Sequence, residues 1–215
     1  MKKLLLSLTF VCAAIGAAKA QTIYYSSDFD SFLDTATVLP GGSNSLTAYG
    51  FPTQFGLIRD DGSGGKALNI YGGEQFNGAN SGAFGALSER ISAGETLLRM
   101  TGEYRTTAAY DGAPWNQTAQ IQFQNTVGFF GYNFIEVSSS TPDWTPFTLD
   151  LNIAGVDPAQ LGQIQANFFI PGFNAGQFQV DNLTVQTTVP EPSTYALLAL
   201  GGAGLGAHLM RRRRR

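Results

Sequence analysis

Residues 147–153 read Phe-Thr-Leu-Asp-Leu-Asn-Ile, and this stretch is the clearest indication of the fold class. Its apolar and polar side chains alternate strictly, which is the period of a β-strand with one face packed and the other in water. Residues 118–124 show the same period, with Ala119, Ile121 and Phe123 on one face and hydroxyl or amide side chains on the other. Alternation of this kind is typical of antiparallel sheets.

Strand-like segments separated by glycine, asparagine and proline turns extend the pattern in both directions. We expect strands at 22–25, 54–59, 67–71, 83–87, 96–105, 118–124, 129–137, 147–153, 165–170 and 178–186, with an irregularity in the last near Asp181-Asn182. Helical turns are expected only at 28–33 and 157–161. Short strands without a βαβ rhythm predict an all-β fold, either a two-sheet sandwich or a barrel.

The first twenty residues predict a secretory signal peptide. Two lysines precede an apolar run, and Ala18-Lys19-Ala20 supplies the small residues of a cleavage site before Gln21. We expect signal peptidase to remove residues 1–20, and with them Cys12, which is the only cysteine. The mature chain then has no disulfide, thiolate nucleophile or cysteine metal site.

The C-terminus is a short polar motif, an apolar stretch and a basic stop, in that order. Residues 195–210 carry no formal charge, and as a helix they would span roughly 24 Å, slightly less than a bilayer core. The positive-inside bias keeps the arginines cytoplasmic and the preceding domain outside. The polar motif consists of Val189, Pro190, Glu191, Pro192, Ser193 and Thr194, and the basic stop of Arg211, Arg212, Arg213, Arg214 and Arg215.

This tail resembles the PEP-CTERM sorting signal of Gram-negative bacteria, which has the same three parts in the same order. The resemblance implies a transient anchor in the inner membrane and processing by an exosortase near Pro190-Glu191-Pro192. The processed domain would pass to the cell envelope or an extracellular matrix. The alternative is an ordinary single-pass tail anchor, which has no need for the motif at 189–194.

Between the two ends lies one expected domain, residues 21–188, with five basic and fifteen acidic side chains and a net charge of −10. Nucleic acid and anionic lipid are poor partners for such a surface. The domain has no histidine and no cysteine, which excludes Ser-His-Asp and Cys-His catalysis and histidine-rich zinc sites. Hydrolysis by a pair of carboxylates remains open on composition alone.

The domain also resembles the galactose-binding-like jelly roll of many carbohydrate-binding modules. The resemblance rests on short elements at 65–70, 91–96, 101–105 and 144–147, and on a closing Val180-Asp181-Asn182 element. It implies an antiparallel two-sheet jelly-roll sandwich, with a structural calcium held by Asp181, Asp28 and Asp30. The alternative is that Asp181-Asn182 forms a bulge and the other two aspartates are solvated caps. Residues 60–64 are expected to form a turn.

Sugar binding would need exposed aromatic rings that stack on pyranose faces. Trp115 lies in a turn-rich stretch with Tyr110 nearby, and these two form the candidate sugar site, whereas Trp144 is expected in the core or at its rim. Three functions follow. The first is a non-enzymatic structural or adhesive envelope protein, the second a carbohydrate-binding module for exopolysaccharide, and the third a carboxylate-pair glycoside hydrolase.

Overall fold

The computed structural model describes residues 21–32, 38–41, 44–49, 56–71, 77–106, 119–137, 141–170 and 177–189. The expected signal peptide, residues 190–215, Tyr110 and Trp115 lie outside these ranges. The elements are β1 (Thr22–Ser27), β2 (Val38–Gly41), β3 (Asn44–Tyr49), β4 (Gly56–Asp60), β5 (Lys66–Tyr71), β6 (Asn77–Asn80), α2 (Leu87–Ser92), β7 (Leu97–Thr106), β8 (Ala119–Asn125), β9 (Gly131–Val137), β10 (Thr145–Asn152), η1 (Ile153–Gly155), η2 (Leu161–Gln163), β11 (Ile164–Ile170) and β12 (Gln177–Thr188).

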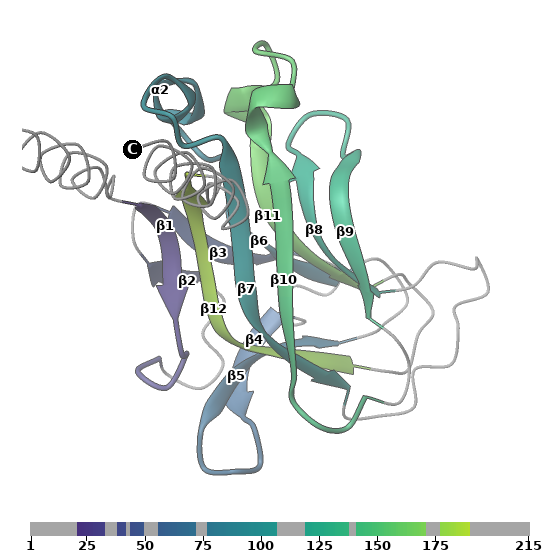
Figure 1. Cartoon of the computed structure of the whole chain (residues 1–215). Coiled ribbons are helices and arrows are strands. Elements are labelled where there is room, and N and C mark those ends of the chain that lie inside the picture. Colours follow the sequence, from purple (N-terminus) through teal and green to yellow (C-terminus); the bar gives the residue numbers. More distant parts are fainter. Residues whose placement is uncertain are drawn as a thin grey trace, which may run out of the picture.

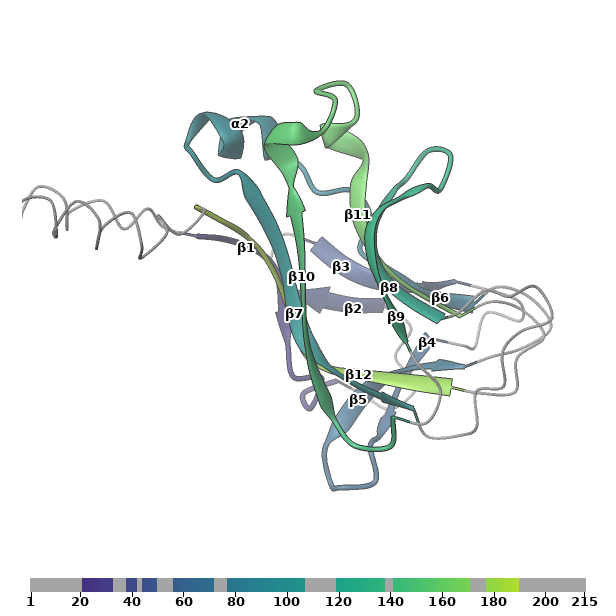
Figure 2. The same ribbon diagram turned by 45° about the vertical axis from the view of Figure 1, so that its right-hand side comes forward.

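Two antiparallel sheets make up the fold (Figures 1 and 2). The β12 sheet has the order β10-β7-β12-β5-β4, and β1 also pairs with β12. The β11 sheet has the order β2-β3-β6-β11-β8-β9. The short helix α2 and the β10–β11 connection lie together at the upper end of the molecule in Figure 1. The prediction of an all-β fold with two antiparallel sheets is confirmed.

The core lies between the sheets and is filled from alternate positions of the strands. On β10 the buried side chains are Phe147, Leu149 and Leu151, as the alternation predicts. Strand β8 contributes Ala119, Ile121 and Phe123, but Gln122 and Gln124 are buried as well, so the expectation that its amide side chains lie in water is wrong at these two residues. Burying each large apolar side chain contributes roughly 1.5–3 kcal/mol. The largest fully buried side chains include Tyr25, Phe29, Phe84, Phe123 and Phe168, which come from both sheets and from the segments that close the ends.

Strand β12 changes its neighbour halfway along. Residues 177–180 pair with β5 and residues 183–187 pair with β1, while β7 follows both halves on the other side. Between Asp181 and Thr184 the register shifts, and Asn182 takes a φ of 50°. Gly102 of β7 faces this bend, because a Cβ there would lie 2.9 Å from the Asp181 carbonyl oxygen. The irregularity expected near Asp181-Asn182 is confirmed.

The structure differs from the prediction in one expected strand and in three strands that were not expected. The strand expected at 83–87 is wrong: Phe84 packs against Tyr24, and the chain then turns at Ala86, with φ 59°, into α2. Strands β2, β3 and β6 were not expected, because they are short, contain proline, glycine or asparagine, and show no alternation. Long-range pairing, rather than local propensity, makes them strands.

The turns expected from the sequence are present. The Gln160 N–H donates to the Asp157 carbonyl at 2.8 Å, and the Phe32 N–H donates to the Phe29 carbonyl at 3.1 Å. Residues 60–64 join β4 to β5 as a turn, in which the Asp61 N–H donates to the Gly65 carbonyl at 3.0 Å. In the described ranges no helix has the length and apolar character needed to cross a membrane, and the expected span at 195–210 lies outside them.

Candidate functional sites

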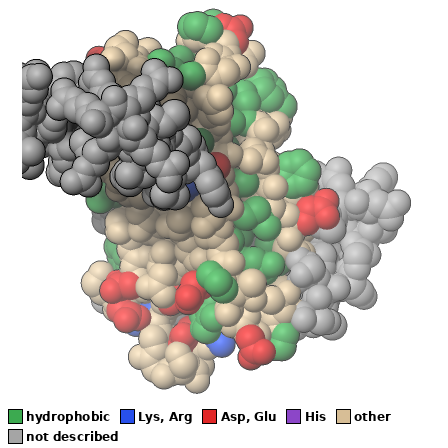
Figure 3. Space-filling model, viewed as in Figure 1, with side chains coloured by type: hydrophobic (Ala, Val, Ile, Leu, Met, Phe, Trp, Pro, Cys, Tyr) green, Lys and Arg blue, Asp and Glu red, His purple; other side chains and the backbone are tan. Residues whose placement is uncertain are grey.

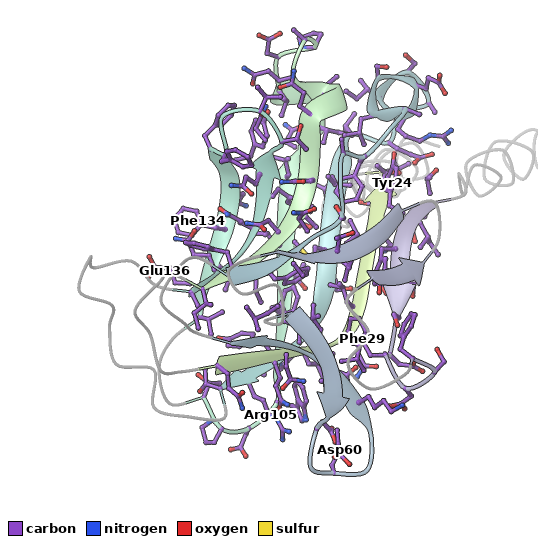
Figure 4. All side chains as sticks on the ribbon, turned by 180° about the vertical axis from the view of Figure 1, so that it is seen from behind. Tyr24, Phe29, Asp60, Arg105, Phe134 and Glu136 are labelled. Carbon is purple, nitrogen blue, oxygen red and sulfur yellow. The ribbon has the colours of Figure 1, made fainter. Side chains whose placement is uncertain are left out.

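Four aspartates meet at the end of the sandwich where β12 bends, and we call this the acidic end. Asp28 and Asp30 follow β1, Asp61 lies in the β4–β5 turn, and Asp181 lies on the bend itself. Asp28, Asp30 and Asp61 are close enough to act electrostatically on the Asp181 carboxylate. Acidic side chains gather at the lower end of the molecule in Figure 3, and Asp60 lies near the tip of the β4–β5 hairpin in Figure 4.

The acidic end shifts two carboxyl groups in opposite directions. Burial, followed by repulsion from the three neighbouring aspartates, raises the pKa of Asp181 to about 6, although the Asn182 N–H donates to its Oδ1 at 2.6 Å. Burial also opposes ionisation of Asp61. There, hydrogen bonds from Ser63 and Gly65 outweigh it and hold the pKa below the ordinary value.

Calcium binding at the acidic end stays a prediction. Carboxylate oxygens are ligands that calcium takes, so the residue types are suitable. Each carboxylate also accepts a backbone N–H, from Asp30 to Asp28 at 3.3 Å and from Lys66 to Asp30 at 2.8 Å. Among the described residues, no three acidic side chains form a group that could hold a metal ion. These bonds match the alternative interpretation, in which the aspartates stabilise turns and a bulge.

An arginine beside the acidic end joins several elements. The Arg105 guanidinium lies 4.5 Å from the centre of the Trp144 ring, and it donates to Gln179 Oε1 at 2.7 Å and to the Asp61 carbonyl. Gln179 in turn donates to Asn69 Oδ1 at 2.7 Å. Trp144 is half-buried, so its expected place at the rim of the core agrees with the structure. One face of its ring is covered by the Arg105 cation.

The face of the β11 sheet that points away from the core is rich in amides, and we call it the amide face. Neighbouring strands place Asn80, Asn167, Gln122 and Phe134 opposite one another in one row. Asn167 and Gln122 are nearly fully buried, whereas Phe134 is half exposed at the β9 edge, beside Glu136 (Figure 4). The other members of the amide face are Gln120, Gln124, Gln165 and Phe169.

The amides on this face are held in position at one end. Gln165 donates to Gln124 Oε1 at 3.4 Å, and Gln124 donates to the Phe129 carbonyl at 2.9 Å, in the β8–β9 turn. That turn also carries exposed Val127, Phe129 and Phe130. The face therefore combines positioned donors and acceptors with aromatic side chains at its margin.

Sequence reasoning missed two of these groupings. The amides of 118–124 were assigned to the wet face, yet nothing in the sequence showed that Asn80 and Asn167 would lie beside them. Asp61 was placed in a turn but not with Asp181. The predicted sugar site of Trp115 and Tyr110 lies outside the described residues and stays a prediction, and so do the roles of Pro190 to Thr194 and of the five arginines.

Comparison with known proteins finds similar folds at low identity. The xylan-binding domain CBM22-1 from Paenibacillus barcinonensis has 14% identity and a TM-score of 0.46, covering 80% of this chain and 97% of its own. A family 11 carbohydrate-binding module from Clostridium thermocellum has 13% identity and a TM-score of 0.44, covering 81% and 99%. An arabinofuranosidase of family GH51 has 14% identity and a TM-score of 0.48, covering 77% and 27%.

Comparison by sequence finds a match to a family model but none to a curated protein. This family model matches the C-terminus, where it begins at the last residue of β12. Residues 188–215 carry the PEP-CTERM protein-sorting motif.

Proposed function

We propose that the chain is an exported, exosortase-processed protein of the cell envelope or extracellular matrix, whose β-sandwich is a non-catalytic structural or adhesive unit. The observation that carries this proposal is the PEP-CTERM motif at residues 188–215, which begins at the last residue of β12. The net charge of −10 on residues 21–188 suits a solvated surface rather than nucleic acid. The described carboxylates of the acidic end are engaged by backbone donors, which fits a structural role.

The test is the fate of the full chain in a host that carries a matching exosortase. Wild-type chain is expected to be shortened and to leave the membrane fraction. A variant with Pro190→Ala, Glu191→Ala and Pro192→Ala is expected to stay uncut and membrane-bound. Glu136→Ala is the matched control, because it removes an exposed acid of β9 that is distant in the sequence from the motif. Equal release of the triple variant and the wild type would contradict the proposal.

The amide face supports a second candidate function, the binding of a neutral polysaccharide. Amide side chains donate and accept at once, which matches vicinal sugar hydroxyls, and aromatic rings stack on the apolar faces of pyranoses. Asn80 and Gln120 are partly exposed and supply the amides, and Phe134 supplies an exposed ring, whereas Asn167 and Gln122 are nearly fully buried beside them. Positioned polar groups beside apolar surface are the usual composition of a ligand site.

A glycan array with the purified domain tests this second candidate. Gln120→Ala and Phe134→Ala are each expected to weaken binding about tenfold, the effect of roughly 1.4 kcal/mol. Val127→Ala is the control, because Val127 is more exposed than Phe134 but lies in the β8–β9 turn. A parallel Trp115→Ala variant tests the site predicted from the sequence. Loss of binding in that variant alone would move the site away from the amide face.

A further inference from the structure

The last residues of β12 are held tightly in the β12 sheet. Thr187 pairs with Thr22 of β1 on one side and with Leu98 of β7 on the other, and Thr188 pairs with Leu97. Thr187 is 0% exposed and Thr188 is 5% exposed, whereas Val189 is 39% exposed. The strand is therefore buried and paired up to the residue before the chain leaves the domain.

A polar clamp secures this end of β12. Thr187 Oγ1 donates to Glu95 Oε2, and Glu95 Oε1 lies 3.8 Å from Arg90 Nη1. Arg90 Nη1 also donates to Thr22 Oγ1 at 3.0 Å. Glu95 is 3% exposed, so its carboxylate lies away from water and losing a partner there is costly, whereas Arg90 is partly exposed. We call Glu95, Arg90, Thr22 and Thr187 the terminal clamp.

The sorting motif follows this clamp without a linker. The matched segment begins at Thr188, which is itself paired in the sheet. Val189 comes next, and Pro190 then removes the backbone N–H that a further ladder bond would need. Recognition of an extended segment by strand addition uses its backbone donors and acceptors. The first residue of the matched segment is already paired with Leu97 of β7.

We propose that the folded sandwich restrains its own processing: Thr188 must leave the β12 sheet before the motif is bound, and the terminal clamp sets how often this happens. Local opening of a strand end has a free energy fixed by its buried contacts and hydrogen bonds, so the clamp lowers the fraction of time that the site is available. The partner is a membrane peptidase that reads an extended segment from Thr188 onward. This inference rests on the proposed processing of the chain.

A reversible cross-link tests the inference without changing the fold. Leu97→Cys with Thr188→Cys, in a Cys12→Ala background, places two cysteines on directly paired residues, a separation that a disulfide spans. Oxidised chain is expected to be cut at least tenfold more slowly than the same chain after reduction. Gln120→Cys with Glu136→Cys is the matched control, since it links β8 to β9 and leaves β12 free.

The outcomes separate this inference from the proposed processing. Equal cleavage of the oxidised and reduced Leu97/Thr188 variants would overturn the inference and leave the processing intact. Failure of the wild type, the reduced variant and the control to be cut would overturn the processing, and the inference with it. Slower cleavage of both oxidised variants would mean that the oxidant or the cross-link acts on the peptidase step in general, which also overturns the inference.

An inserted copy of the flanking residues gives a second measurement. Gly-Ser-Gly-Ser-Thr-Val placed between Val189 and Pro190 supplies a Thr-Val pair outside the sheet, and cleavage is expected to become several-fold faster. The same insertion between Gly82 and Ala83, which are both exposed, is expected to leave the rate unchanged. An unchanged rate for the first insertion would show that release of Thr188 is not required.

Discussion

Two acidic side chains have different surroundings along β12, one beside its C-terminal end and one at its bend. At the C-terminal end, Glu95 faces Arg90 and accepts a hydrogen bond from Thr187. At the bend, Asp181 faces three other aspartates, and its pKa is raised to about 6, first by burial and then by their repulsion. The carboxylate beside the C-terminal end of β12 therefore has a cation and a hydroxyl donor as partners, whereas the carboxylate at the bend has like charges as neighbours.

The difference shows how a single strand is fixed at one place and strained at another. A buried carboxylate with a cation and a hydroxyl donor stabilises the packing around it, and it is strongly missed when removed. A carboxylate among like charges opposes folding whenever it is ionised. We expect removal of the Glu95 carboxylate and removal of the Asp181 carboxylate to change the stability of the domain in opposite directions.

The largest effect is expected from Glu95→Ala. The change leaves Thr187 without its acceptor and Arg90 without its carboxylate. The cost is about 2–3 kcal/mol, less than for a fully buried pair because Arg90 is partly exposed to water. The melting temperature should fall by roughly 5–10 °C. Glu136→Ala, at an exposed position, should change stability by less than about 0.5 kcal/mol. A similar fall in both variants would remove the contrast between the ends.

A smaller loss is expected from Gly102→Ala, which acts on the bend. The added Cβ would lie 2.9 Å from the Asp181 carbonyl oxygen and 3.0 Å from the Phe147 ring, so the backbone or the ring must shift. Overpacking of this kind costs about 1–3 kcal/mol, which urea unfolding would measure. Gly85→Ala is the control, because a Cβ there meets nothing within 4 Å. A harmless Gly102→Ala would mean that the bend tolerates adjustment.

Asp181→Asn is expected to stabilise the domain above pH 6. The native pKa of about 6 lies above the ordinary value of 3.8, so the folded chain binds more protons between these values. Stability of the wild type therefore falls as pH rises from about 4 to about 6, and the full penalty remains above that range. The variant should gain about 1 kcal/mol at pH 8 after allowance for solvent screening. Melting temperatures across pH 4–8 would show a flatter profile for the variant. A variant whose melting temperature changes with pH as the wild type's does would contradict the raised pKa of Asp181.

The smallest effect is expected from calcium. A bound divalent cation would relieve the repulsion at Asp181, Asp28 and Asp30, so calcium at a few times its Kd should add about 0.5–1 kcal/mol. Asp181→Asn should lose most of this increment. A melting temperature that is the same in calcium and in a chelator would leave the aspartates as turn and bulge residues only.

Much of the fold could be predicted from local pattern. The period of β10 identified its buried face, that of β8 identified the side chains that face the core, and the irregularity at Asp181-Asn182 marked the bend of β12. Segments without alternation were the ones missed. Gly78 and Asn80 of β6 have no strand propensity, and they pair because β3 and β11 flank them. The stretch 83–87 has strand-like residues, but packing of Phe84 and the turn at Ala86 start α2 instead.

The candidate sites were less predictable, because their members are distant in the chain. Glu95 and Thr187 are separated by ninety-two positions, and no local spacing joins them. The same holds for Asn80, Asn167 and Gln122, which form one row only through the order of β6, β11 and β8. A sequence shows which residues share one face of a strand, but not which strand comes next in the sheet.

The sequence by itself determined the fold class and the sorting motif, because both are written in local order: alternation along each strand, and a linear segment at residues 188–215. The tertiary structure alone decided which polar groups meet. It placed Asp181 among like charges, gave Glu95 its hydroxyl donor Thr187, and paired the first residue of the sorting motif with Leu97. The physical reason is that register and strand order bring together residues whose separation along the chain carries no signal.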